Sequence, residues 1–154
     1  MYSNQNYYYV PQHYDYYRLP SNNQLVNDIQ KASNAEYSAI ICYEKLAKMA
    51  PTKEERNRIL EIQQDEKRHL NEFRSIYANL TGTNPTYKII EKCPEKYREG
   101  IEFALKDEQE SVDFYLEIAD KSQNPYIKER FRRAAADEQN HAVWFLYFFH
   151  KSKR

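Results

Sequence analysis

An internal repeat constrains the fold of this chain more than any other feature of its sequence. The second copy lies 72 residues after the first, and the residues that match include Glu36 with Glu108, Tyr43 with Tyr115, Ala47 with Ala119, Asp65 with Asp137, Glu66 with Glu138, and His69 with His141. Both copies carry apolar residues at helical spacing over two long segments. The repeat therefore predicts a helical hairpin that occurs twice in one domain.

Caps and breakers mark the starts of four predicted helices. The first runs from about residue 23 to 49, the second from 52 to about 80, the third opens at Pro94, and the fourth opens at Asn124. Thr52 and Glu55 have the spacing of a capping box, and Pro125 follows Asn124 at the first helical position. These signals are typical of helix N-termini.

The connections between the helices differ in length. The first and third are tight turns, whereas the second covers residues 81–93 and contains Gly82 and Pro85. A connection of that length can stretch about 43 Å, and a helix of roughly 27 residues is about 40 Å long, so the third helix can begin at the opposite end of the bundle. The pattern predicts an all-α four-helix bundle with a long crossover between helices two and three.

Composition narrows the function classes. Two glycines are few for a β-sandwich or an α/β fold, and 23 basic against 23 acidic residues leave no net charge to attract nucleic acid. Residues 1–10 lack a signal peptide, and the longest apolar run, 142–149, is too short to span a membrane. Cys42 and Cys93 form no CxxC pair and are predicted to be reduced thiols. We therefore expect a cytoplasmic protein without a membrane partner.

Two segments favour contacts beyond the bundle. Residues 1–20 hold seven tyrosines and form a low-complexity tail in front of the bundle, residues 21–154. Residues 143–149 are apolar nearly all round, which predicts a homodimer or coverage by the tail or the long loop. We expect part of residues 7–17 to dock in extended form on this end of helix four or across a dimer partner.

Charged residues occupy positions on the predicted buried faces. Glu66 and His69 fill the middle of helix two's apolar stripe, and Glu138 and His141 do the same in helix four. Glu36 and Glu108 take the corresponding positions in helices one and three. Buried carboxylates that converge repel one another unless a cation neutralises them, so the six residues predict a di-metal site. An i, i+3 ion pair on a solvated helix face is the weaker alternative, because the ExxH spacing occurs twice at matched register.

The pattern resembles the ferritin-like di-iron carboxylate proteins, and most closely the short rubrerythrin-like members, over residues 23–150. This resemblance implies two irons held by Glu36, Glu66, His69, Glu108, Glu138 and His141. Residues 65–69 also resemble the D-E-x-R-H signature of di-iron oxygenases, whose Asp hydrogen-bonds a ligand His. Asp65 and Asp137 are therefore the candidate partners of the ligand histidines.

The chain departs from rubrerythrins in two respects. It carries no rubredoxin-type CxxC pairs, so we expect a separate electron donor, and Ser111 stands where rubrerythrins have an additional glutamate. We expect ferroxidase activity or the reduction of peroxide or oxygen, with manganese or zinc able to replace iron. The alternative is a structural or metal-storage protein whose Tyr-rich tail mediates assembly.

The remaining residues of interest are interpreted as having structural roles. Tyr43 and Tyr115 are predicted to be core aromatics whose hydroxyls bond ligand carboxylates, with a redox role as the alternative. Cys42 is interpreted as a small packing residue, and His13 and His150 as surface residues. The charged runs 53–58 and 128–133 are interpreted as solvated helix faces.

Overall fold

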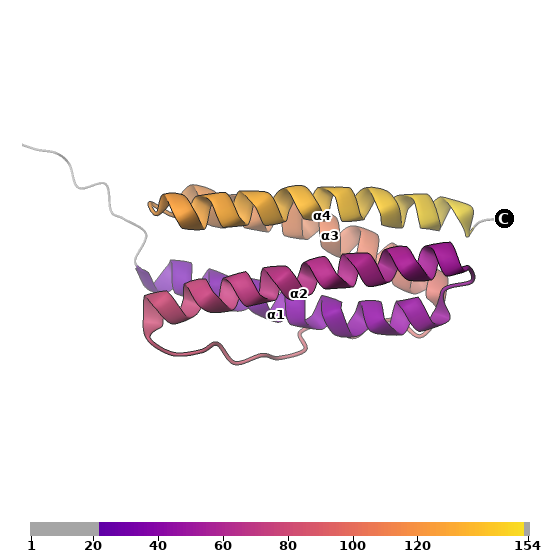
Figure 1. Ribbon diagram of the computed structural model, residues 1–154, viewed down its shortest axis with the longest axis horizontal. Helices are drawn as coiled ribbons and strands as arrows, with labels where there is room; N and C mark the ends of the chain where they lie inside the picture. The colour runs from indigo at the N-terminus through magenta and orange to yellow at the C-terminus, as the bar shows by residue number, and fades with distance from the viewer. Residues whose placement is uncertain (1–21, 153–154) are drawn as a thin grey trace, which may run out of the picture.

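The computed structural model describes residues 22–152, which form four helices and no strand. The helices are α1 (Asn22–Met49), α2 (Lys53–Thr81), α3 (Tyr97–Lys121) and α4 (Pro125–Lys151). They lie alongside one another as two antiparallel hairpins, α1 with α2 and α3 with α4 (Figure 1). The predicted all-α bundle with a crossover between helices two and three is confirmed. The predictions for the tail, including His13, lie outside the described residues.

The helix ends mostly follow the predicted chemistry. The Thr52 hydroxyl accepts a hydrogen bond from the Glu55 backbone N–H, and the Asn124 side chain accepts from two N–H groups of α4. Gly82 ends α2 with a φ of 74°, a left-handed conformation that glycine adopts without strain. The predicted start of helix three at Pro94 is wrong by three residues. Cys93 is bonded to α1, and this attachment holds residues 93–96 outside the helix.

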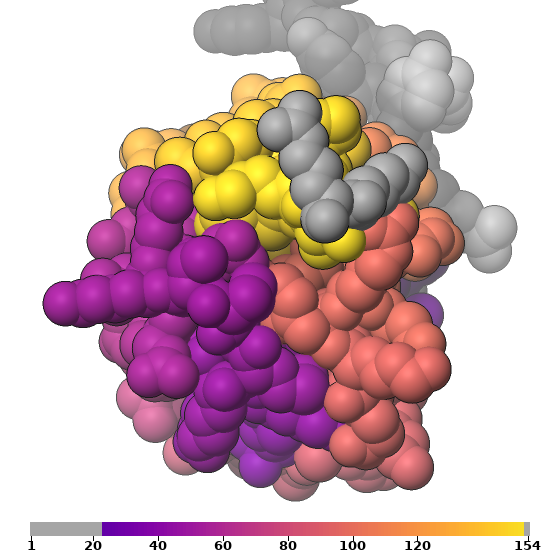
Figure 2. Space-filling view, turned by 90° about the vertical axis from the view of Figure 1, so that its right-hand side faces the viewer, coloured from indigo at the N-terminus to yellow at the C-terminus, as the bar shows by residue number. Residues whose placement is uncertain are grey.

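Two apolar clusters lie at the two ends of the bundle and leave a polar layer between them. One cluster includes Phe73, which stacks on Phe131 with ring centroids 4.3 Å apart. The other includes Leu46, Phe145 and Phe148, all fully buried. The end view in Figure 2 shows the turn between α1 and α2, the start of α3 and the end of α4 packed closely together. The polar layer is thus closed off from water along the bundle axis.

The crossover, residues 82–96, runs back along the outside of α1 (Figure 1). Three α1 side chains, spaced one turn apart, hold its backbone: Gln30 donates to the Thr86 carbonyl, Asn34 accepts from the Lys88 N–H, and Ser38 accepts from the Ile90 N–H. Tyr37 also stacks on Tyr87. These contacts bring the end of the crossover beside the second half of α1.

The cysteines are paired, which corrects the prediction of two reduced thiols. Cys42 of α1 forms a disulfide with Cys93 of the crossover, with Cα atoms 5.1 Å apart. The two residues are 51 positions apart in the sequence, so their proximity depends on the path of the crossover along α1. Cys42 does pack in the core, as predicted, but as half of a cross-link.

The end of α4 is only partly covered within the chain. The Arg58 guanidinium lies 4.1 Å from the centre of the Trp144 ring, which also packs near Phe148. Val143 and Leu146 remain 61% and 54% exposed. His150 is exposed, as predicted. Within residues 22–152, no helix is long and apolar enough to cross a membrane.

Candidate metal centre

All six predicted metal ligands meet in the polar layer at the middle of the bundle. α1 and α3 contribute one glutamate each, and α2 and α4 contribute a glutamate and a histidine each: Glu36, Glu108, Glu66 with His69, and Glu138 with His141. Each of the six is at most 4% exposed. They point inward because all of them occupy the apolar stripe of their helix.

The ligand atoms form two overlapping groups. One contains Glu36 and His69, the other contains Glu108 and His141, and both contain Glu66 and Glu138. Within each group the candidate ligand atoms lie within 4.8 Å of one another. Two carboxylates shared between two groups can bridge two metal ions, each of which keeps its own terminal glutamate and histidine.

The histidine rings are oriented for this arrangement. Nδ1 of His69 lies 3.0 Å from Glu138 Oε1 and 3.2 Å from Glu66 Oε2. Nδ1 of His141 lies 3.1 Å from Glu66 Oε1 and 3.3 Å from Glu138 Oε2. The Nδ1 atoms of both rings therefore face the shared carboxylates, and the Nε2 atoms are left for other partners.

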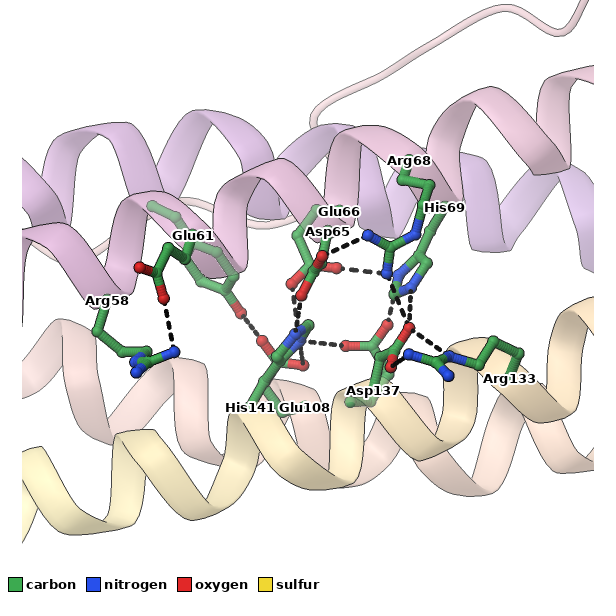
Figure 3. Close-up of polar contacts among 12 residues, drawn as sticks. Arg58, Glu61, Asp65, Glu66, Arg68, His69, Glu108, Arg133, Asp137 and His141 are labelled. Atoms are coloured by element: carbon green, nitrogen blue, oxygen red, sulfur yellow. Dashed lines mark hydrogen bonds and ion pairs between the residues drawn. The ribbon is translucent and has the colours of Figure 1, made fainter.

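Those partners are the two predicted aspartates, which reach across between the hairpins (Figure 3). His69 Nε2 of the first hairpin lies 3.2 Å from Asp137 Oδ2 of the second, and His141 Nε2 lies 3.1 Å from Asp65 Oδ2. An Nε2–H that donates to a carboxylate leaves the Nδ1 lone pair free for a metal. Each hairpin thus orients the histidine of the other.

Two arginines pair with the aspartates that contact the ligand histidines, and the sequence did not lead us to predict these pairs. Arg68 donates to Asp137 at 2.9 Å and also pairs with Asp65, while Arg133 lies 2.8 Å from Asp137 (Figure 3). The interpretation of Arg133 as part of a solvated face is therefore incomplete. The available signal was its position four residues before Asp137, a spacing at which opposite charges pair on a helix.

Tyr43 and Tyr115 each hydrogen-bond a candidate ligand of the other hairpin. Tyr43 of α1 donates to Glu108 Oε1 of α3, and Tyr115 of α3 donates to Glu36 Oε1 of α1, both at 2.6 Å. Burial and the neighbouring glutamate charge raise the pKa of each phenol well above its usual value. The hydroxyls therefore keep their protons and hold the terminal carboxylates in place.

The four buried glutamates of the site favour the binding of a cation. Burial, followed by the charges of Glu138 and Glu66, raises the pKa of Glu36 and of Glu108 well above the usual value. Oε1 of Glu66 and Oε1 of Glu138 are buried, and the histidine Nδ1 atoms that lie 3.1 and 3.0 Å from them make their hydrogen bonds to the Oε2 atoms instead. Buried carboxylate oxygens without donors are costly, and metal ions would satisfy them. The set of four carboxylates and two imidazoles suits iron, manganese or zinc.

Metal binding should release protons. Burial lowers the pKa of His69 and His141, but hydrogen bonds to the surrounding carboxylates outweigh it and raise both. With the pKa values of Glu36 and Glu108 raised too, the metal-free site holds protons at neutral pH, and a metal must displace them. We expect zinc binding in weakly buffered solution to release about two or more protons per chain, and affinity to fall from about pH 8 to about pH 6. Proton release near zero with a pH-independent affinity would contradict this assignment.

Replacing Asp137 with asparagine should weaken metal binding about 10- to 100-fold, because the His69 ring loses its anionic partner. Asp113→Asn is a matched control, since Asp113 is exposed on α3 away from the six ligands. Calorimetric titration with zinc compares the two variants. Equal affinities would show that Asp137 does not orient His69.

Comparisons with known proteins agree with this geometry. A rubrerythrin family model matches residues 99–154. The uncharacterized protein YhjR of Bacillus subtilis (strain 168) is 49% identical over 140 residues, which cover 88% of this chain and 97% of that protein. A ferritin-like, diiron-carboxylate protein from Bacillus anthracis str. Ames shares the fold at 24% identity, with a TM-score of 0.72 over 83% of this chain and 96% of that one.

A hypothetical protein from Pyrococcus furiosus superimposes with a TM-score of 0.73 at 21% identity, over 82% of this chain and 88% of that one. At these identities the two solved structures show the fold alone, and the family model matches only about the last third of the chain, whereas the relative from B. subtilis is similar over nearly all of it. The buried Glu/His cluster is compatible with a di-metal site. The chain belongs to the rubrerythrin-like branch of the ferritin-like di-iron carboxylate proteins.

Proposed function

We propose that this protein is a non-haem di-iron oxidoreductase that oxidises ferrous iron or reduces peroxide or oxygen at the centre of the bundle. The observation that carries the proposal is the pair of overlapping ligand groups that share Glu66 and Glu138. Two irons held by shared carboxylates can each supply one electron to the same small oxidant.

The six candidate ligands would have different roles at the metal pair. Glu66 and Glu138 would bridge the metals, Glu36 with His69 and Glu108 with His141 would complete the two positions, and the apolar clusters exclude water along the axis. Asp65 and Asp137 hold the Nε2 protons of the histidines in place. Manganese or zinc would fit the same donors, but zinc supplies no electrons.

Anaerobic loading with ferrous iron, followed by pulses of peroxide or oxygen in the presence of a separate electron donor, tests the proposal. We expect repeated turnover, seen as ferric absorption that rises after each pulse and decays as the donor reduces the iron. A single slow oxidation, or none, would instead support a structural or metal-storage protein.

Two further proposals concern the surroundings of the protein. We propose a cytoplasmic location, where reductants keep iron ferrous and can reduce the Cys42–Cys93 disulfide, and cell fractionation tests it. Homodimerisation through the exposed apolar residues of α4 stays a prediction. Sedimentation at micromolar concentration should show a dimer, and replacing Val143 and Leu146 with serine should convert it to a monomer, since both side chains are more than half exposed.

A further inference from the structure

The disulfide joins the two parts of the chain that lead into the terminal ligands. Cys42 lies on α1 six residues after Glu36, which is about 9 Å along the helix axis. Cys93 lies at the end of the crossover, just before α3, which carries Glu108. The only two cysteines of the chain are therefore placed beside the candidate metal centre.

A continuous path connects the sulfur atoms to the site. Tyr43 follows Cys42 directly in α1, and its hydroxyl donates to Glu108 Oε1 at 2.6 Å. On the other side, Cys42 lines a small cavity together with Phe103 and Asp107, the residue before Glu108. Covalent bonds and one short hydrogen bond thus separate Cys42 from a ligand carboxylate.

The two sulfur atoms differ in accessibility. Cys42 is 3% exposed and lies within a helix, whereas Cys93 is partly exposed and lies in the non-helical crossover. An external thiolate can therefore attack Cys93 Sγ, and the Cys42 thiolate is the leaving group. The pair combines one buried sulfur on α1 with one that a reductant can reach.

We propose that Cys42 and Cys93 are an electron store for the metal centre, a role that rests on the proposed di-iron function. The two thiols lose two electrons and two protons as the S–S bond forms, and two ferric ions each gain one electron. Peroxide that reoxidises the two ferrous ions would take one electron from each and the two protons that the thiols released, and would leave as two water molecules, so that both ions return to the ferric state and no further proton is needed. A dithiol reductant from outside then reduces the disulfide by exchange and is itself oxidised to a disulfide.

The fold favours this direction of electron flow. The disulfide closes a loop of about 50 residues, and a cross-link of that span stabilises the folded chain. By linkage, folding stabilises the disulfide relative to the dithiol, which makes the folded dithiol a stronger reductant than the same pair in an unfolded chain. An inert structural clasp would share this stability but would not respond to the oxidation state of the metal.

The stoichiometry of peroxide consumption tests the proposal. The full chain is reduced with a dithiol reagent, freed of the reagent and loaded anaerobically with ferrous iron. Reduced wild type should consume about two peroxide molecules per chain and end as the disulfide, and Cys42→Ser/Cys93→Ser should consume about one. Free thiols are counted by alkylation and intact mass. If the serine variant does not fold, wild type alkylated at both thiols replaces it.

Zinc-loaded wild type is the matched control, because zinc fills the site but is redox-inert. Its thiols should oxidise at least about tenfold more slowly than those of the iron-loaded protein. Equal rates would show direct attack of peroxide on the thiols and overturn the proposal. Equal peroxide consumption by wild type and the serine variant, with ferrous iron oxidised in both, would overturn the electron store alone. Ferrous iron that resists peroxide in both proteins would overturn the proposed function as well.

Discussion

Replacement of Glu66 by alanine is expected to abolish the binding of both metals. Glu66 belongs to both ligand groups, so its loss opens both metal positions at once. Loss of an outer partner of a ligand already costs about 10- to 100-fold in affinity, and we therefore expect loss of a shared ligand to exceed about 100-fold at each position. Metal content after anaerobic loading, measured per folded chain, checks this.

Glu36→Ala is the informative companion variant. Glu36 belongs to only one of the two groups, so this variant should retain about one metal ion per chain, held by Glu108 and His141 with the shared carboxylates. Helical circular dichroism confirms that both variants are folded. If Glu66→Ala bound two ions as tightly as wild type, the bridging role of Glu66 would be wrong.

Reduction of the Cys42–Cys93 disulfide is expected to lower the free energy of unfolding by about 4 kcal/mol. The estimate follows from the chain entropy of a loop that closes over 51 positions of sequence. It corresponds to a fall in melting temperature of roughly 10 °C for a domain of this size. Urea unfolding of metal-free protein with and without a dithiol reductant measures the difference.

Cys93→Ser provides the control for this experiment. Its stability should match that of reduced wild type and should not change further when the reductant is added. Identical urea midpoints for oxidised and reduced wild type would show that contacts along α1 hold the crossover without help from the disulfide. The same comparison shows how firmly the crossover is attached to the bundle.

The sequence predicted the bundle and the ligand cluster because both depend on helical periodicity. Glu66 and His69 are three residues apart, so they share one face of α2 whatever the tertiary context. The repeat then transferred this result to Glu138 and His141. Local caps likewise predicted the starts of α2 and α4 to within a residue.

Features that depend on the path of a loop or on contacts between hairpins could not be predicted in this way. The pairing of Cys42 with Cys93 follows from a crossover whose backbone is held by single side chains of α1, and no periodic pattern encodes that path. The shared role of Arg68 depends on the approach of α2 to α4, which brings Asp137 within reach. The start of α3 shifted for the same reason, because it depends on the anchoring of Cys93.

Anomalous diffraction at the iron edge, from crystals of the full chain grown anaerobically with ferrous iron, tests the di-metal site most directly. We expect two iron peaks in the middle of the bundle, about 3.5 to 4 Å apart, with Glu66 and Glu138 between them. A single peak outside the bundle, or no peak among the six residues at full iron occupancy in solution, would contradict it.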